Sequence, residues 1–129
     1  MKAIIQTTLA PAAIGPYSQA VEMSGLIFVS GQIPLDPKTG AIASTSVEDQ
    51  THRAIQNMIE ILHAAGASVN DVLKTTIFIK DMNDFPKVNC VYGEYFQQNA
   101  PARACVEVSR LPKDSLIEIE AIAYKKRDA

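Results

Sequence analysis

The chain has 129 residues, with 12 Lys and Arg side chains against 14 Asp and Glu, so its formal net charge at pH 7 is -2. That length suits one domain over residues 1–129 that buries a core without disulfides, and the charge excludes the overall basic field that favours nucleic acid as a partner. No apolar run approaches the length of a membrane span, which predicts a cytoplasmic protein without a membrane partner. Cys90 and Cys105 lack the spacing of a metal site, so we expect reduced thiols and no bound metal.

The first predicted elements are two short strands, at residues 17–22 and 26–30. The second is rich in the branched and aromatic residues that suit a sheet. Gly31 follows it directly, and residues 33–40 are dense in turn formers, so the chain leaves the sheet here. Because glycine carries no side chain, we expect the backbone at Ser30 and Gly31 to let a ligand approach closely.

A helix is predicted next, and its start has two possible capping signals. Either Thr45-x-x-Glu48 or Ser46-x-x-Asp49 forms the capping box. Apolar residues then recur at helical spacing up to Gly66, which favours an amphipathic helix packed on the core.

A strand at residues 72–80 and a second helix follow. We expect Asn83 to cap this helix, with Pro86 tolerated in its first turn. Asn89 lies four residues beyond the first member of the predicted buried stripe, so it points near that stripe. The stripe consists of Phe85, Val88, Tyr92, Tyr95 and Phe96.

The stretch from Pro101 to Glu120 sets an arginine, a thiol and carboxylates on a strand-like background. In its first strand, alternation puts Arg103, Cys105 and Glu107 on one face. The other face is apolar and is expected to belong to the core; it consists of Ala104, Val106 and Val108.

Turn residues at 111–115 make a hairpin the simplest interpretation of the two C-terminal strands. If these strands pair antiparallel, Cys105 falls near Glu118 and Arg103 falls near Glu120. Cation, thiol and carboxylates would then share one surface, which is typical of a binding site built on a sheet.

The order strand, strand, helix, strand, helix, strand, strand favours an α+β fold with both helices packed on one face of a mixed sheet. The face of the sheet away from the helices is either polar and solvated or covered by partner subunits. The apolar alternation in several strands favours an oligomer.

Each polar residue in these patterns has an ordinary structural interpretation beside a functional one. Arg103 either clamps a carboxylate or is a surface arginine, and Cys105 is either a ligand contact or a small buried hydrophobe. Glu118 is either a general base or the solvated side of an edge strand. Tyr17 and Asn89 either hold a substrate or serve packing and backbone bonding. The residue pattern leaves these alternatives open.

Nearly the whole chain closely resembles the Rid (YjgF) family of reactive-intermediate deaminases. The resemblance implies a chorismate-mutase-like α+β fold, a homotrimer around a β-sheet barrel, and clefts at the subunit interfaces. Four segments carry it: APAAIGPYSQA at 10–20, VSGQIP at 29–34, KTTIFIKDMNDF at 74–85 and PARACVEVSRLPKDSLIEIEAIA at 101–123.

The resemblance also implies roles for individual residues. Arg103 matches the carboxylate-binding arginine, and Glu118 matches the acidic residue that positions the hydrolytic water, so these two are the implied catalytic residues. Cys105 matches the thiol that lines the pocket, and the remaining substrate-binding positions are matched by Tyr17, Ser30, Gly31 and Asn89. One departure is that residues 97–100 look shorter than in typical members and lack an aromatic residue ahead of the PAR motif, which bears on substrate size.

The implied activity is that of a 2-iminobutanoate/2-iminopropanoate deaminase. Such an enzyme hydrolyses 2-aminoacrylate and 2-aminocrotonate, through their imine tautomers, to 2-keto acids and ammonia without a cofactor. The alternative is a non-catalytic regulatory protein that binds a keto acid or amino acid in the same cleft. A ribonuclease role, reported for some relatives, is disfavoured by the acidic charge balance.

Overall fold

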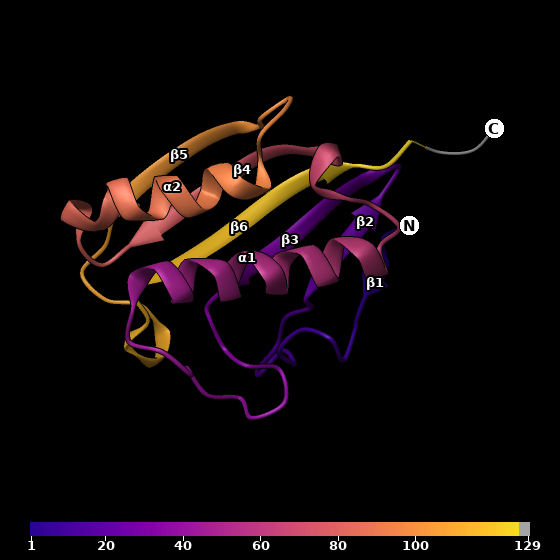
Figure 1. Ribbon diagram of the computed structural model, residues 1–129. Helices are drawn as coiled ribbons and strands as arrows, with labels where there is room; N and C mark the ends of the chain where they lie inside the picture. The colour runs from indigo at the N-terminus through magenta and orange to yellow at the C-terminus, as the bar shows by residue number, and fades with distance from the viewer. Residues whose placement is uncertain (127–129) are drawn as a thin grey trace.

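The computed structural model describes residues 1–126, in which two helices lie on one face of a mixed six-stranded sheet (Figure 1). The strands follow the spatial order β1-β2-β3-β6-β4-β5, and only the β4–β5 pair is parallel. This arrangement confirms the predicted placement of both helices on one face of a mixed sheet. The elements are β1 (Ala3–Ile5), β2 (Ala20–Met23), β3 (Leu26–Gln32), α1 (Val47–Ala64), β4 (Val72–Ile79), α2 (Phe85–Tyr95), β5 (Ala102–Glu107) and β6 (Ile117–Tyr124).

Helix α1 is capped by Ser46, the first residue of the second predicted signal, but the full capping box does not form, because the Ser46 N–H donates to the Ser44 hydroxyl and not to Asp49. The Ser46 hydroxyl accepts a hydrogen bond from the backbone N–H of Asp49 at 3.2 Å, which satisfies one of the free donors of the first turn. Gly66 follows the helix with a φ of +81°, a left-handed conformation that glycine adopts without steric cost. The apolar face of α1 packs on the sheet, and its core members are Ala54, Ile55, Met58, Ile61 and Leu62.

The predicted cap of α2 is wrong, because Asn83 lies inside a short 3₁₀ turn, Met82–Asp84, instead of preceding the helix. The side chain of Asp81 caps this turn by accepting from the Asn83 N–H at 2.9 Å. The helix proper begins at Phe85, with Pro86 tolerated in its first turn. In the predicted stripe, Val88, Tyr92 and Phe96 are buried, and Phe85 and Tyr95 are half-buried.

The predicted C-terminal hairpin is also wrong, because β4 lies between β5 and β6. Strand β5 follows α2, and a helical crossover returns the chain parallel to β4, whereas β6 inserts between β3 and β4. An intervening strand therefore separates Cys105 from Glu118 and Arg103 from Glu120.

The side of β5 that was predicted to face the core faces away from it. Val106 is 42% exposed and Ala104 is also exposed, whereas Cys105 packs against the core. Helix α2 contacts the face that carries Arg103, and this contact decides which side of the strand is covered. Val108, the third predicted core residue, is half-buried just beyond the strand.

The N-terminal region adds a strand that was not predicted. Strand β1 pairs antiparallel with β2 and forms one edge of the sheet. Strand β2 begins at Ala20, so the preceding residues 17–19 belong to a loop instead of the strand predicted for 17–22. Within residues 1–126, no helix combines the length and the apolar character needed to cross a membrane.

We call the side of the sheet opposite the helices the open sheet face. No described element of the chain covers it, as Figure 1 shows, because α1 and α2 both pack on the other side. Alternation buries Ile27, Ile117 and Ile119 beneath the helices and directs their neighbours outward. The open sheet face is consequently rich in exposed apolar side chains: Ile4, Met23, Leu26, Phe28, Val106 and Tyr124.

Candidate functional site

The predicted site residues divide into two groups on opposite faces of the sheet. Arg103 pairs with Thr75, which is fully buried beneath the helices, whereas Glu118 pairs with Phe78. Thr75 and Phe78 are three residues apart in one strand, so their side chains point to opposite faces. We call Asn89, Arg103 and Cys105 the arginine group, and Tyr17, Ser30, Gly31 and Glu118 the glutamate group.

The arginine group is assembled between β5 and α2. Nη1 of Arg103 donates a hydrogen bond to Oδ1 of Asn89 at 2.7 Å. The guanidinium carbon lies 5.3 Å from the ring centroid of Phe85 and 4.9 Å from that of Tyr92, within the range of cation–π attraction. Asn89 therefore lies near the aromatic stripe, as its spacing predicts.

Cys105 is half-buried two residues beyond Arg103 on the same side of β5. Burial raises the pKa of its thiol, and the nearby charge of Arg103 lowers it by a smaller amount. The raised pKa keeps the side chain a neutral thiol at neutral pH. A thiolate nucleophile needs the opposite shift, so this environment favours a lining role over covalent chemistry.

The glutamate group centres on a close approach between β3 and β6. A Cβ atom added to Gly31 would lie 2.7 Å from Oε2 of Glu118, so the carboxylate occupies space that only glycine leaves free. Burial raises the pKa of Glu118, and the negative charge of Glu120 raises it further. A carboxylate with a raised pKa is a stronger base than an ordinary one at neutral pH.

Ser30 connects this region to the chain that precedes β2. Its hydroxyl donates to the Ser18 carbonyl at 2.6 Å, and its backbone N–H donates to the Gln19 carbonyl at 2.9 Å. These bonds hold the second half of β3 against residues 18–19, which directly follow Tyr17. The Ser30 hydroxyl is thus engaged within the chain, where its oxygen can still accept another hydrogen bond.

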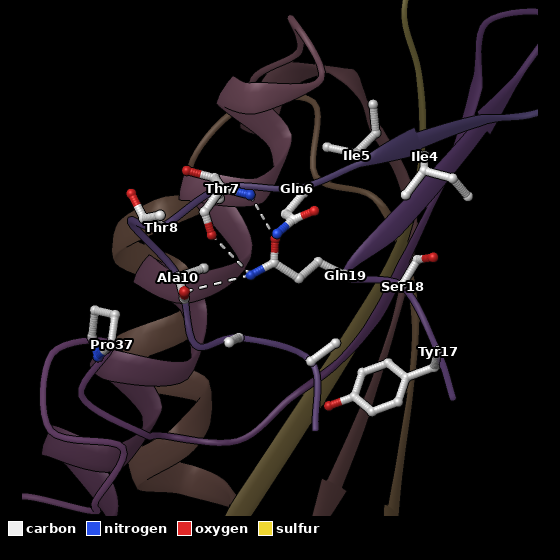
Figure 2. A pocket seen from close by; sticks show the side chains of 12 residues that line it. Ile4, Ile5, Gln6, Thr7, Thr8, Ala10, Tyr17, Ser18, Gln19 and Pro37 are labelled. Atoms are coloured by element: carbon white, nitrogen blue, oxygen red, sulfur yellow. Dashed lines mark hydrogen bonds between the residues drawn. The ribbon is translucent and has the colours of Figure 1, made fainter. Parts of the chain in front are cut away.

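Tyr17 is 53% exposed and borders two cavities. One has a volume of about 420 Å³ and lies between the N-terminal residues and the 10–19 loop (Figure 2). The other, of about 320 Å³, is also lined by Gly31 and by apolar residues that include Ile33 and Leu35. Tyr17 therefore shares the second cavity with Gly31, whereas Glu118 is not among the residues that line it.

Gln19 is a structural member of this region that the sequence patterns missed. Its buried side-chain amide accepts from the Thr7 N–H at 2.7 Å and donates to the carbonyls of Thr7 and Pro11 at 3.0 and 2.8 Å. Figure 2 shows this amide between Thr7 and Ala10, holding the loop that leads to Tyr17. Gln19 fell inside the strand predicted for residues 17–22, and nothing in that pattern indicated a side chain buried among loop carbonyls.

The arrangement offers a cation with free N–H donors in one group and a strengthened base in the other. Brought to one site, these two groups would suit a small substrate with a carboxylate and a carbon that water attacks, but within one chain they lie on opposite faces of the sheet. Among residues 1–126, no three His, Cys, Asp or Glu side chains cluster as the ligands of a metal ion would.

Comparison with known proteins finds close relatives of the chain as a whole. Residues 7–125 match the protein family described as Endoribonuclease L-PSP. A RutC family protein of Pyrococcus horikoshii is 59% identical over 126 residues, which cover 98% of this chain and 100% of the relative. A protein of Salmonella typhimurium named 2-iminobutanoate/2-iminopropanoate deaminase is 53% identical over 129 residues, covering 98% of this chain and 100% of the relative. The crystal structure of E. coli TdcF with bound serine has a TM-score of 0.92 and 49% identity, covering 96% of this chain and 99% of that one.

Proposed function

The chain belongs to the endoribonuclease L-PSP family, also called the YjgF or Rid family, and on this basis we propose that it hydrolyses reactive enamine and imine intermediates. The substrates are 2-iminopropanoate and 2-iminobutanoate, the tautomers of 2-aminoacrylate and 2-aminocrotonate. The products are 2-keto acids and ammonia. Relatives that carry the name of this activity are about half identical to the chain over nearly its whole length.

The observation that carries the proposal is the Glu118 carboxylate, which is half-buried against the Gly31 backbone with a raised pKa. Binding of a carboxylate alone needs an arginine but no such base, so this feature favours turnover over simple ligand binding. The Gly31 backbone adjoins this carboxylate. Tyr17 and Ser30 are proposed to line the same pocket.

In the proposed reaction, Arg103 binds the substrate carboxylate and orients C2 of the protonated imine toward a water molecule. Glu118 takes a proton from this water as its oxygen bonds to C2, and a tetrahedral amino alcohol forms. Glu118 then returns the proton to the amino group, the C2–N bond breaks, and ammonia departs. The hydroxyl proton is lost as the keto group forms and leaves with ammonia as ammonium.

We further propose that the site is completed by a second copy of the chain, in a homotrimer. The arginine group and the glutamate group lie on opposite faces of one sheet, so they meet most directly when they come from neighbouring subunits. The exposed apolar side chains of the open sheet face supply a surface that association would bury. Sedimentation analysis tests this assembly, and a stable monomer with full activity would contradict it.

The proposed activity is tested by making 2-aminoacrylate from serine with a dehydratase and following pyruvate and ammonia formation. We expect the wild-type protein to accelerate both, Arg103→Ala to abolish nearly all of the acceleration, and Cys105→Ser to retain much more activity than Arg103→Ala. Arg110→Ala is the matched control, because Arg110 is exposed in an ion pair with Asp114 and such pairs contribute little. If folded wild-type protein accelerates neither this reaction nor that of 2-aminocrotonate made from threonine, the non-catalytic ligand-binding alternative replaces the deaminase.

A further inference from the structure

Three side chains of α2 surround the guanidinium of Arg103. Phe85, Asn89 and Tyr92 are separated by four and then three residues, so they lie on one stripe of the helix. Each of them contacts Arg103, Asn89 through a hydrogen bond and the two aromatic rings through their faces. Three side chains on one stripe of α2 thus contact a single side chain of the neighbouring strand.

The guanidinium lies close to both rings. Phe85 and Tyr92 are seven residues apart, about 10 Å along the helix axis at 1.5 Å per residue. The guanidinium carbon nevertheless lies 5.3 Å from one ring centroid and 4.9 Å from the other. Asn89 bonds Nη1 from the same stripe, so the side chain is held at three points although Arg103 belongs to an exposed edge strand.

The Tyr92 ring is itself held by contacts with Thr75 and Phe96. Its hydroxyl shares a hydrogen bond of 2.7 Å with Oγ1 of Thr75, which is fully buried and pairs with Arg103 in the β4–β5 ladder. Its ring also packs on Phe96, with centroids 4.5 Å apart. Burial raises the pKa of Tyr92 while the Arg103 charge lowers it by a smaller amount, as expected for a neutral ring beneath a cation.

We propose that Phe85 and Tyr92 are positioning residues that form an aromatic cradle for Arg103, so that the substrate carboxylate meets a guanidinium already aligned to bind it. This inference rests on the proposed function, in which Arg103 holds the carboxylate. The rings attract the cation and restrict its rotation, and this restriction removes much of the entropy loss that a free arginine suffers on binding.

The cradle also leaves the binding atoms of the guanidinium available. An arginine has five N–H donors in one plane, and Asn89 uses only one of them. A carboxylate can therefore accept two parallel hydrogen bonds from N–H groups that Asn89 does not use. Lysine, which lacks a flat face and a fork, would not use this cradle in the same way.

The first test measures the cradle without any catalysis. In protein labelled with ¹⁵N-arginine, the Arg103 side-chain Nε–Hε signal, assigned with Arg103→Lys, is expected to be shifted by the rings and to show restricted motion. Phe85→Leu and Tyr92→Leu should each reduce the shift and the restriction, whereas Tyr92→Phe, which keeps the ring, should preserve most of both. Tyr95→Leu is the matched control, since Tyr95 is a half-buried aromatic residue on the same helix that contacts His52.

The second test measures binding of pyruvate, a stable carboxylate, by titration. We expect Phe85→Leu and Tyr92→Leu to raise its Kd by about 2- to 30-fold, the range that corresponds to cation–π energies. Tyr92→Phe and Tyr95→Leu should remain within about twofold of wild type. Because Tyr92 is buried, the half-buried Phe85 provides the variant that is safer for folding.

The outcomes separate this inference from the proposed function. An unchanged Arg103 signal and an unchanged pyruvate Kd in both folded leucine variants would overturn the cradle, whatever the protein's catalytic activity. A weaker ring shift and weaker pyruvate binding in the leucine variants, with both kept in Tyr92→Phe, would support the cradle. If the wild-type protein does not hydrolyse imines, the proposed function fails, while the two measurements still decide whether the cradle positions a carboxylate-binding arginine.

Discussion

Arg103 and Glu118 lie on opposite faces of one sheet, two strands apart and offset by three residues along the ladder. Ordinary sheet spacings put their Cα atoms about 14 Å apart. A substrate the size of 2-iminopropanoate is much shorter than that distance, and the sheet itself stands between the two side chains. Two copies of the chain that bring unlike faces together would remove this obstacle.

Mixed assemblies of two inactive variants should regain activity. Arg103→Ala keeps Glu118 and Glu118→Gln keeps Arg103, so each mixed closed ring of three subunits should contain one restored site among its three. The measurement is imine hydrolysis by co-expressed, differently tagged chains purified through both tags. Arg103→Ala mixed with the double variant is the control, because no site in that mixture combines both residues. Absence of recovery in proven mixed assemblies would contradict a shared site.

Gly31→Ala should lower kcat/KM by about 100-fold, the scale reported for displacement of a reacting group by about 1 Å. The new Cβ would lie 2.7 Å from Oε2 and 2.8 Å from Cδ of Glu118, so the carboxylate must move. Gly93→Ala is the matched control, because its Cβ would meet no atom within 4 Å. It should leave the rate within about twofold and stabilise α2 by about 0.5–1 kcal/mol. Equal rates for the two variants would argue against a role for the Glu118 position.

The pH dependence of hydrolysis should report the environment of Glu118. Burial and the charge of Glu120 raise its pKa, so the rate should fall as pH drops through that raised value and the base becomes protonated. Glu120→Gln removes the like charge, lowers the Glu118 pKa and should shift the acidic limb to lower pH. Glu60→Gln, on α1 across the sheet, should leave the limb in place. A limb that moves to higher pH in Glu120→Gln would contradict this assignment.

The raised pKa of Glu118 should also make the free energy of unfolding depend on pH. A folded-state pKa above the unfolded one means that the folded chain binds the Glu118 proton more tightly. The contribution of this group to the free energy of unfolding is therefore present below the unfolded pKa and declines as pH rises through the folded one. Urea denaturation of wild type and Glu118→Gln across this range measures the difference, which should grow in favour of the variant as pH rises.

Gln19→Leu should lower the free energy of unfolding by about 1–3 kcal/mol, because it leaves partly buried groups of the N-terminal loop without partners. Urea denaturation at a fixed protein concentration measures this cost. Gln6→Leu, at an exposed position of the same loop, should change stability by less than about 0.5 kcal/mol. A Gln19→Leu variant as stable as Gln6→Leu would show that these bonds do not anchor the loop.

Local patterns predicted most of the elements correctly. The capping signal at Ser46, the helical spacing that follows it, and the alternation of Ile117 and Ile119 depend on residues close in the chain. The prediction of a C-terminal hairpin was wrong because strands 102–107 and 117–124 are consecutive in sequence, and the sequence carried no sign that β4 lies between them. The prediction of the core-facing side of β5 was wrong for a related reason, since contact with α2 decides which face of the strand is covered.

The amino-acid sequence by itself determined the fold class, the family and the identity of the candidate site residues, because these depend on short motifs and on periodicity. Only the tertiary structure decided how those residues are grouped. Strand order and register set Arg103 and Glu118 on opposite faces, and helix packing brought Phe85 and Tyr92 close to the Arg103 guanidinium. The physical reason is that alternation along a strand specifies only which side chains share a face. Which strand lies next to it, and which face a helix covers, depends on contacts between elements that are distant in the chain.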